Sequence, residues 1–153
     1  MAVGTVSGVN LDEQWQLISS QTASGSSITF NSFSGYKTLW LVGRNITKSA
    51  SNYVRIRING DSAGGSYATL YAAGTQSGFL SNGDAVGAQA ISFKIYNIDQ
   101  AIPHIVDGAN FDGNDYARAE AYINPVVVTS LVIDNLSGAT FTGGTFSLYG
   151  IAA

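Results

Sequence analysis

An all-β fold is predicted, because apolar and polar residues alternate in short runs along the whole chain. The clearest run, residues 53–59, places three aliphatic side chains on one face of a strand and two arginines on the other. The aliphatic residues are Val54, Ile56 and Ile58, which should be buried, and the arginines are Arg55 and Arg57, which should lie outside. Residues 90–96 and 145–149 repeat the pattern. No segment shows a sustained helical period.

Turn-forming residues separate the expected strands. Asn59-Gly60 and Asn82-Gly83 favour tight turns, because asparagine and glycine tolerate positive φ. Pro125 is expected to separate two strands, since it cannot donate to a central ladder. Short strands at this spacing indicate a β-sandwich or barrel. The expected strands are residues 14–19, 26–31, 37–44, 52–59, 67–72, 90–97, 102–107, 116–124, 126–134 and 145–151.

The length of 153 residues suits one domain with a sizeable core. We assign residues 14–153 to this domain. Residues 1–13 are small, apart from an acidic pair at Asp12-Glu13, and are predicted to form an N-terminal docking arm. The chain has no cysteine, so neither a disulfide nor a cysteine-based metal site is expected. No signal peptide or membrane-spanning segment is expected either.

The chain is unusually poor in charge. Charged residues make up 11% of it, against about 25% in a typical domain. The formal net charge is −3, and no stripe of Lys and Arg is present to neutralise phosphates, so nucleic-acid binding is not expected. A surface rich in Ser, Thr, Asn, Gly and Tyr suits a protein partly covered by neighbouring subunits. The alternative is a β-protein surface that is simply polar and uncharged.

Aromatic residues are plentiful, with eight Tyr, seven Phe and two Trp. Most match the inward phase of a strand or its boundary. Large aromatic side chains carry much of the buried area in cores and interfaces. A core or subunit-interface role, rather than a ligand platform, is therefore predicted for Trp15, Phe30, Trp40, Phe93 and Phe146.

Catalytic motifs are weak. The single histidine, His104, follows Pro103 in an apolar strand, and no Gly-x-Ser-x-Gly elbow accompanies it. We predict a structural or exposed histidine. Ser34 and Lys37 match Ser-x-x-Lys, but they precede a strand instead of sharing a helical turn. Glu120 lies in a strand with Arg118, and a solvated or interfacial ion pair is expected there rather than the paired carboxylates of a glycosidase.

Two further features have a structural and a functional interpretation. Residues 107–115 are dense in oxygen ligands that could hold Ca²⁺. Counted from Asn110, however, the sixth and twelfth positions are Asp115 and Ala121, where an EF-hand needs Gly and Glu, so an acidic turn is predicted. Arg55 and Arg57 could meet an acidic partner or remain solvated. The prediction is therefore a non-enzymatic protein with no catalytic residue, cofactor or metal site.

The segments that carry a family resemblance are Trp15-Gln16-Leu17-Ile18-Ser19-Ser20, Ser27-Ile28-Thr29-Phe30, Tyr36, Leu39-Trp40-Leu41-Val42, Val54-Arg55-Ile56-Arg57-Ile58-Asn59-Gly60-Asp61-Ser62, Gly65-Ser66-Tyr67 and Gly144-Thr145-Phe146-Ser147-Leu148-Tyr149-Gly150. Together they resemble the small β-sandwich structural proteins of tailed bacteriophages. These serve as capsid decoration (cement) proteins, head spikes or tail appendages. The resemblance covers residues 15–67 and 144–150 best, whereas residues 75–140 depart, as an exposed, partner-specific region would.

The resemblance implies a jelly-roll-like antiparallel β-sandwich, homotrimers and no catalysis. It favours a capsid decoration protein at the surface of the virion, with the major capsid protein or another virion protein as its partner. The alternative is a tail-fibre or appendage protein that recognises glycans on the host surface. A free carbohydrate-binding module and a sandwich hydrolase are less well supported. No nucleic-acid or membrane partner is expected.

Overall fold

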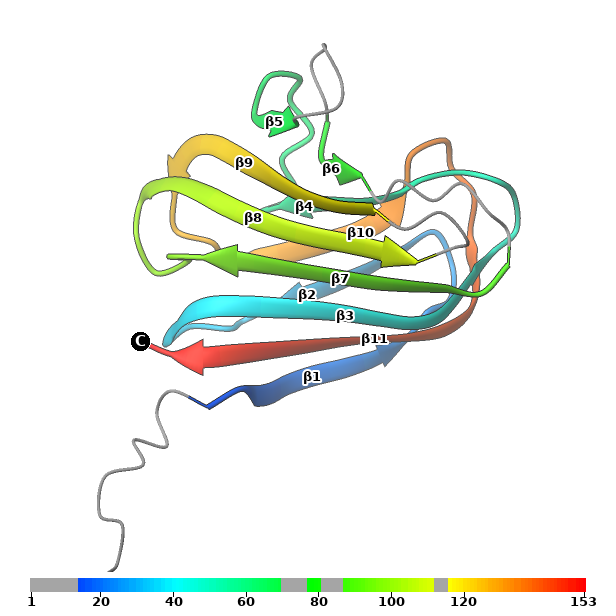
Figure 1. Ribbon diagram of the computed structural model, residues 1–153, viewed down its shortest axis with the longest axis horizontal. Coiled ribbons are helices and arrows are strands. Elements are labelled where there is room, and N and C mark those ends of the chain that lie inside the picture. Colours follow the sequence, from blue (N-terminus) through cyan, green and yellow to red (C-terminus); the bar gives the residue numbers. More distant parts are fainter. Residues whose placement is uncertain (1–13, 70–76, 81–86, 112–115) are drawn as a thin grey trace, which may run out of the picture.

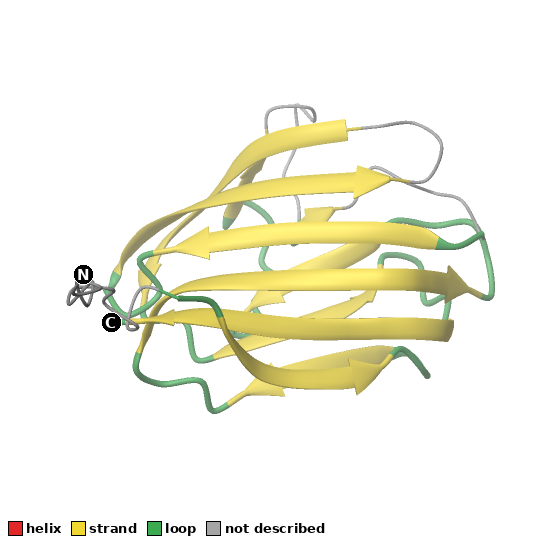
Figure 2. Ribbon diagram, turned by 60° about the horizontal axis from the view of Figure 1, so that its bottom comes forward, coloured by secondary structure: helices red, strands yellow, loops and turns green. Residues whose placement is uncertain are grey.

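The computed structural model describes residues 14–69, 77–80, 87–111 and 116–153. These residues form strands and connecting loops without any helix (Figure 2). It follows that this part of the chain offers no helix able to cross a membrane. The arm predicted at residues 1–13 lies outside the described residues, so its boundary and role stay predictions.

The strands form two antiparallel sheets that face each other (Figure 1). The large sheet has seven strands, in the spatial order β1 (Gln16–Thr22), β11 (Phe141–Ala152), β3 (Tyr36–Lys48), β7 (Gln89–Tyr96), β8 (Ile102–Phe111), β9 (Tyr116–Val126) and β5 (Tyr67–Thr69). The small sheet has four, in the order β2 (Ser27–Asn31), β10 (Ser130–Asn135), β4 (Val54–Ile58) and β6 (Phe79–Leu80).

The strand order is that of a jelly roll. Four strands of the large sheet, β1-β11-β3-β7, oppose the four strands β2-β10-β4-β6, and the chain passes between the two sheets in the double Greek-key sequence. The hairpin β8–β9 is inserted between β7 and β10 and widens the large sheet, and β5 adds to its edge. The predicted all-β, jelly-roll-like antiparallel sandwich is confirmed.

The core lies between the sheets and consists of aliphatic and aromatic side chains from both. The burial register predicted for β4 is confirmed, since Val54, Ile56 and Ile58 are each 0% exposed while the two arginines between them point to the other face. Three of the aromatic residues expected in a core or interface, Phe30, Phe93 and Phe146, belong to this core.

One predicted strand break is wrong. Strand β9 continues through Pro125 and ends at Val126. On one side β9 pairs with β5, but only over Glu120–Tyr122, so Pro125 lies beyond the stretch that has neighbours on both sides. Its missing N–H is therefore tolerated, as at a sheet edge. Strand β6 was not predicted, because two residues are too few to show alternation.

Candidate interaction surfaces

The outer face of the large sheet carries an aromatic cluster, which consists of Trp15, Trp40 and Tyr149 with Lys94 among them. Trp40 lies between its cross-strand neighbours Tyr149 on β11 and Lys94 on β7. Its ring centroid is 5.4 Å from that of Trp15 and 5.7 Å from that of Tyr149. The Nζ atom of Lys94 lies 5.4 Å from the Trp40 centroid and 5.9 Å from that of Trp15, within cation–π range.

Hydrogen bonds fix this cluster on the sheet. The indole Nε1 of Trp40 donates to the hydroxyl of Ser92 at 2.8 Å. One strand further, Asp107 lies opposite Lys94 and accepts a hydrogen bond of 2.9 Å from the hydroxyl of Tyr96. Trp15 and Trp40 are half-buried in the isolated chain. They lie outside the core, so of the two predicted roles the core role is wrong for them and the interface role stays a prediction.

Aliphatic side chains extend the apolar character of this outer face. Leu17 on β1 and Ile105 on β8 are each 58% exposed, and Ile123 on β9 is 48% exposed. Ile105 and Ile123 each follow a buried residue, and Leu17 lies opposite Tyr149, so all three project from the same side of the sheet as the aromatic cluster. An apolar surface that spans several strands is typical of a site that a partner covers.

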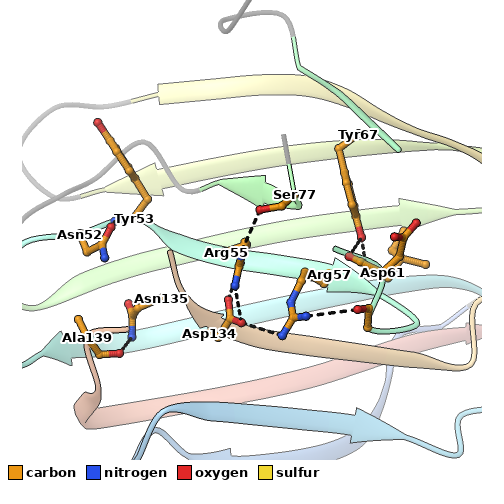
Figure 3. A network of polar contacts seen from close by, with 12 residues as sticks. Asn52, Tyr53, Arg55, Arg57, Asp61, Tyr67, Ser77, Asp134, Asn135 and Ala139 are labelled. Carbon is orange, nitrogen blue, oxygen red and sulfur yellow. Dashed lines mark hydrogen bonds and ion pairs between the residues drawn. The ribbon is translucent and has the colours of Figure 1, made fainter. Parts of the chain in front are cut away.

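The outer face of the small sheet is different, since an ion-pair network covers it (Figure 3). The carboxylate of Asp134 on β10 binds Arg55 through two hydrogen bonds, of 2.8 and 2.9 Å, and Arg57 through a third, of 2.8 Å. Arg55 also donates to Ser77 at 2.8 Å. The two guanidinium groups have an acidic partner within the chain, so the solvated alternative is wrong, whereas contact with an acidic partner protein stays a prediction.

A second polar network ties the β4–β5 loop to strand β9. One carboxylate oxygen of Asp61 accepts hydrogen bonds from the hydroxyl of Tyr122, at 2.8 Å, and from Asn124, at 3.1 Å, and the other accepts from the backbone N–H of Ala63 at 2.8 Å. Burial alone would raise the pKa of Asp61, but these hydrogen bonds hold it below its usual range. Sequence reasoning missed this site, because its partners lie far apart in the chain.

Tyr67 completes the network from the adjacent strand. Burial raises its pKa well above the usual range, so the phenol stays protonated and donates to the main-chain oxygen of Asp61 at 2.8 Å. The same hydroxyl accepts a hydrogen bond from the backbone N–H of Ile58 at 3.0 Å. The ring packs edge-on against Phe79, with centroids 4.9 Å apart. This network stabilises a loop and brings together no catalytic pair.

His104 has the structural role that was one of its two predicted alternatives. It is 0% exposed and its ring stacks on Tyr122. Its two ring nitrogens face main-chain carbonyl oxygens, that of Tyr96 at 3.1 Å and that of Val126 at 2.7 Å. Because a carbonyl oxygen can only accept, the donor of each hydrogen bond that the ring makes here is a ring N–H, and the ring lies between the ends of β7 and β9.

The other candidate residues do not assemble into a reaction centre. Glu120 is 5% exposed on the inward face of β9, so the solvated alternative is wrong. The side chain of Arg118 lies outside the described residues, so its pairing with Glu120 stays a prediction. Four of the nine residues of the predicted acidic turn, 112–115, are not described either, and residues 107–111 belong to strand β8 rather than to a turn. Elsewhere in the described chain, no three His, Asp or Glu side chains gather to hold a metal. Ser34 and Lys37 flank the start of β3, without a helix.

The β2–β3, β7–β8 and β9–β10 loops lie at the end of the sandwich that carries the C-terminus (Figure 1). A groove lies among these loops. It has a volume of about 560 Å³ and lies between the β2–β3, β7–β8 and β9–β10 loops. The lining residues are Asn31, Ser32, Phe33, Ser34, Gly35, Tyr36, Ile98, Asp99, Val127, Val128, Thr129 and Ser130. Phe33, Ile98 and Val128 are buried and form its floor.

No protein-family model matches the sequence, and no curated protein matches it either. The fold therefore defines the class, a jelly-roll β-sandwich with an inserted hairpin. Jelly rolls serve many unrelated functions, so the function has to be argued from the surfaces.

Proposed function

We propose that the protein is a structural protein of a tailed-bacteriophage virion, and that it decorates the capsid surface as a homotrimer. The observation that carries the proposal is the outer face of the large sheet, where Leu17, Ile105 and Ile123 are exposed beside the aromatic cluster. A chain with so few charged residues gains solubility when such a face is covered. The sequence resemblance to phage decoration proteins supports a tailed-bacteriophage virion as the particle to which the protein binds.

The face suits assembly better than catalysis. Aromatic residues are enriched at the buried centres of protein interfaces, whereas Asp and Glu are depleted there. Three copies related by a threefold axis can each bury this face against a neighbour, and the ion-pair network of the small sheet then stays on the outside. The major capsid protein, or another virion protein, is the expected partner of the trimer on the particle.

Light scattering on the purified protein tests the assembly. We expect a mass three times that of the chain. Ile105→Asp should yield monomers that keep the β fold, because this side chain is 58% exposed and supports little of the core. Thr29→Asp, an exposed position on the small sheet, is the matched control and should stay trimeric. A monomeric wild type that also fails to trimerise on heads would contradict the proposal.

Electron microscopy of intact particles tests the location. The proposal expects symmetric copies of the protein over the head, and binding of the purified protein to expanded, undecorated heads. Density at the tail tip would instead support the second candidate, an appendage that recognises host-surface glycans. The observation that favours this candidate is the groove at the loop end, where polar side chains surround an apolar floor.

A further inference from the structure

The groove at the loop end has the size and the shape of a small-ligand site. Its volume of about 560 Å³ falls within the ~300–1,000 Å³ typical of ligand pockets. Its floor is apolar, formed by Phe33, Ile98 and Val128. Its rim is polar, with hydroxyl, amide and carboxylate groups from exposed side chains. The rim residues are Asn31, Ser32, Ser34, Asp99 and Thr129.

The loops that build the groove are held in place before any ligand arrives. The side-chain oxygen of Asn59 accepts the N–H groups of Thr129 and Ser130, at 2.8 and 3.1 Å, and its amide donates to the carbonyl of Val127 at 2.9 Å. The β9–β10 loop is thereby fixed from behind. Asn59 itself adopts a positive φ of 51°, which asparagine tolerates better than most residues.

Backbone hydrogen bonds join the remaining loops to one another. The N–H of Val128 donates to the carbonyl of Ile98 at 2.9 Å, and the N–H of Ile98 donates to that of Lys37 at 3.1 Å. The N–H of Ala153 also donates to the carbonyl of Gly35, at 3.0 Å, and joins the end of β11 to the β2–β3 loop. A site ordered in this way loses little conformational entropy when it binds, which favours affinity.

The lining chemistry selects the class of ligand. Among the described residues that line the groove, Asp99 alone is charged, so the groove offers no cation to an anionic ligand. Serine, threonine, asparagine and aspartate side chains suit a ligand rich in hydroxyl groups, which both donates and accepts. The apolar floor and the half-buried ring of Tyr36 suit the C–H face of a pyranose ring.

We propose that this groove binds one or two units of a neutral sugar. The sugar places its C–H face on the floor and its hydroxyl groups along the rim, where Asp99 accepts hydrogen bonds. Acidic sugars are disfavoured by the same carboxylate. This inference goes beyond capsid decoration and does not depend on it, since a groove at the loop end stays open when the outer face of the large sheet is covered.

Saturation-transfer NMR on the full chain provides the test. The probes are methyl glycosides of glucose, galactose, mannose and N-acetylglucosamine and their β-linked disaccharides, each at about 10 mM, a concentration that detects weak binding. Methyl glucuronide is the acidic probe. Ser34→Trp fills the groove, and Asp99→Asn removes its charge while it preserves its shape. The matched controls are Ser137→Trp, an exposed residue at the opposite end of the sandwich, and Asp107→Asn.

We expect at least one neutral probe to bind the wild type and both control variants. Binding should be lost in Ser34→Trp and weakened about tenfold in Asp99→Asn, as is typical when a charged hydrogen-bond acceptor is lost. Three results would overturn the proposal: no neutral probe binds, binding persists unchanged in both groove variants, or glucuronide binds as tightly as the neutral probes. Each is independent of where the protein sits on a particle.

Discussion

Arg55 and Asp134 are cross-strand neighbours on β4 and β10, and they share two hydrogen bonds in a forked arrangement, from Nε to Oδ1 at 2.8 Å and from Nη2 to Oδ2 at 2.9 Å. Arg57 adds a third bond to the same carboxylate. The side chains are only 17%, 20% and 12% exposed for Arg55, Arg57 and Asp134. One carboxylate thus pairs with two partly buried cations, and it balances one of their two charges.

Asp134→Asn should therefore destabilise the fold. The substitution leaves two guanidinium groups without a counter-charge, and we expect the free energy of unfolding to fall by about 2–3 kcal/mol, somewhat less than for a fully buried pair. Urea denaturation measures the loss. Asp99→Asn, at an exposed carboxylate, is the control and should change stability by less than about 0.5 kcal/mol. Equal losses in the two variants would show that the ion-pair network contributes little.

Gly144 is predicted to be irreplaceable, in contrast to its neighbour Gly143. Gly144 has a φ of 101°, and a Cβ atom there would lie 2.5 Å from the carbonyl oxygen of Asn45 and 2.7 Å from that of Arg44. Backbone atoms cannot give way cheaply, so Gly144→Ala should cost about 2–4 kcal/mol. At Gly143 the nearest atom is the side-chain oxygen of Thr47 at 2.9 Å, which can rotate.

Thermal or urea unfolding of both alanine variants checks this contrast. Gly143→Ala should lose about 1 kcal/mol or less, because only a side chain has to move. The position matters, since the register between β11 and β3 shifts on both sides of Gly143. A Gly144→Ala variant as stable as the Gly143→Ala variant would mean that the strand relaxes there without strain.

Alternation was sufficient to predict which residues of β4 are buried, because a shift of one residue would have placed the arginines in the core. It could not identify the partner of Arg55. Asp134 is 79 residues away in the sequence, and only the β10–β4 pairing brings it near. Burial pattern is a local property of a strand, whereas the choice of an ion-pair partner depends on strand order.

The groove was not predicted either, because it too depends on how distant segments of the chain are brought together. Its lining comes from three loops that are separate in the sequence, and Asn59, which orders one of them, was predicted only as a turn residue. At Pro125, by contrast, local sequence predicted a strand break that the structure does not have. The missing N–H of Pro125 can be read from the sequence. Whether it interrupts a ladder depends on β5, which is too short to reach that part of β9. Edge and centre of a sheet cannot be told apart from local sequence.

His104 should contribute strongly to stability although it has no catalytic neighbour. His104→Ala removes the ring whose nitrogens face the carbonyls of Tyr96 and Val126, and it leaves a cavity beside Tyr122. We expect a loss of about 3–4 kcal/mol. His104→Gln should lose less, since its amide can still donate to one carbonyl. The exposed neighbour Ile105 is the control, and Ile105→Ala should lose under about 1 kcal/mol in the monomer.

Denaturation in urea compares the three variants, and it should be done under conditions where Ile105→Ala and the wild type have the same oligomeric state. This precaution matters, since Ile105 belongs to the proposed subunit interface and its truncation could otherwise alter the measured stability through assembly. If His104→Ala were as stable as Ile105→Ala, the contacts of the ring with the two carbonyls and with Tyr122 would contribute little to the stability of the fold.

Asp61 should make the stability depend on pH in acid. Its folded-state pKa is lowered, chiefly by hydrogen bonds that outweigh the opposing effect of burial, so the unfolded chain holds the proton more tightly than the folded chain does. The stabilisation is complete above the unfolded pKa of about 4 and is lost as the pH falls through the folded value. Acidification therefore favours unfolding through this group.

Asp61→Asn should remove this contribution. The variant should be less stable than the wild type at pH 7, and the difference should shrink as the pH falls below about 4, because the wild-type carboxyl is then protonated too. Tyr122→Phe, which removes one donor to the carboxylate, should show a smaller change of the same sign. Urea titrations at several pH values measure all three curves. If the difference between wild type and Asp61→Asn stayed constant from pH 7 to about pH 2, the network would stabilise the loop through its shape and not through the charge of Asp61.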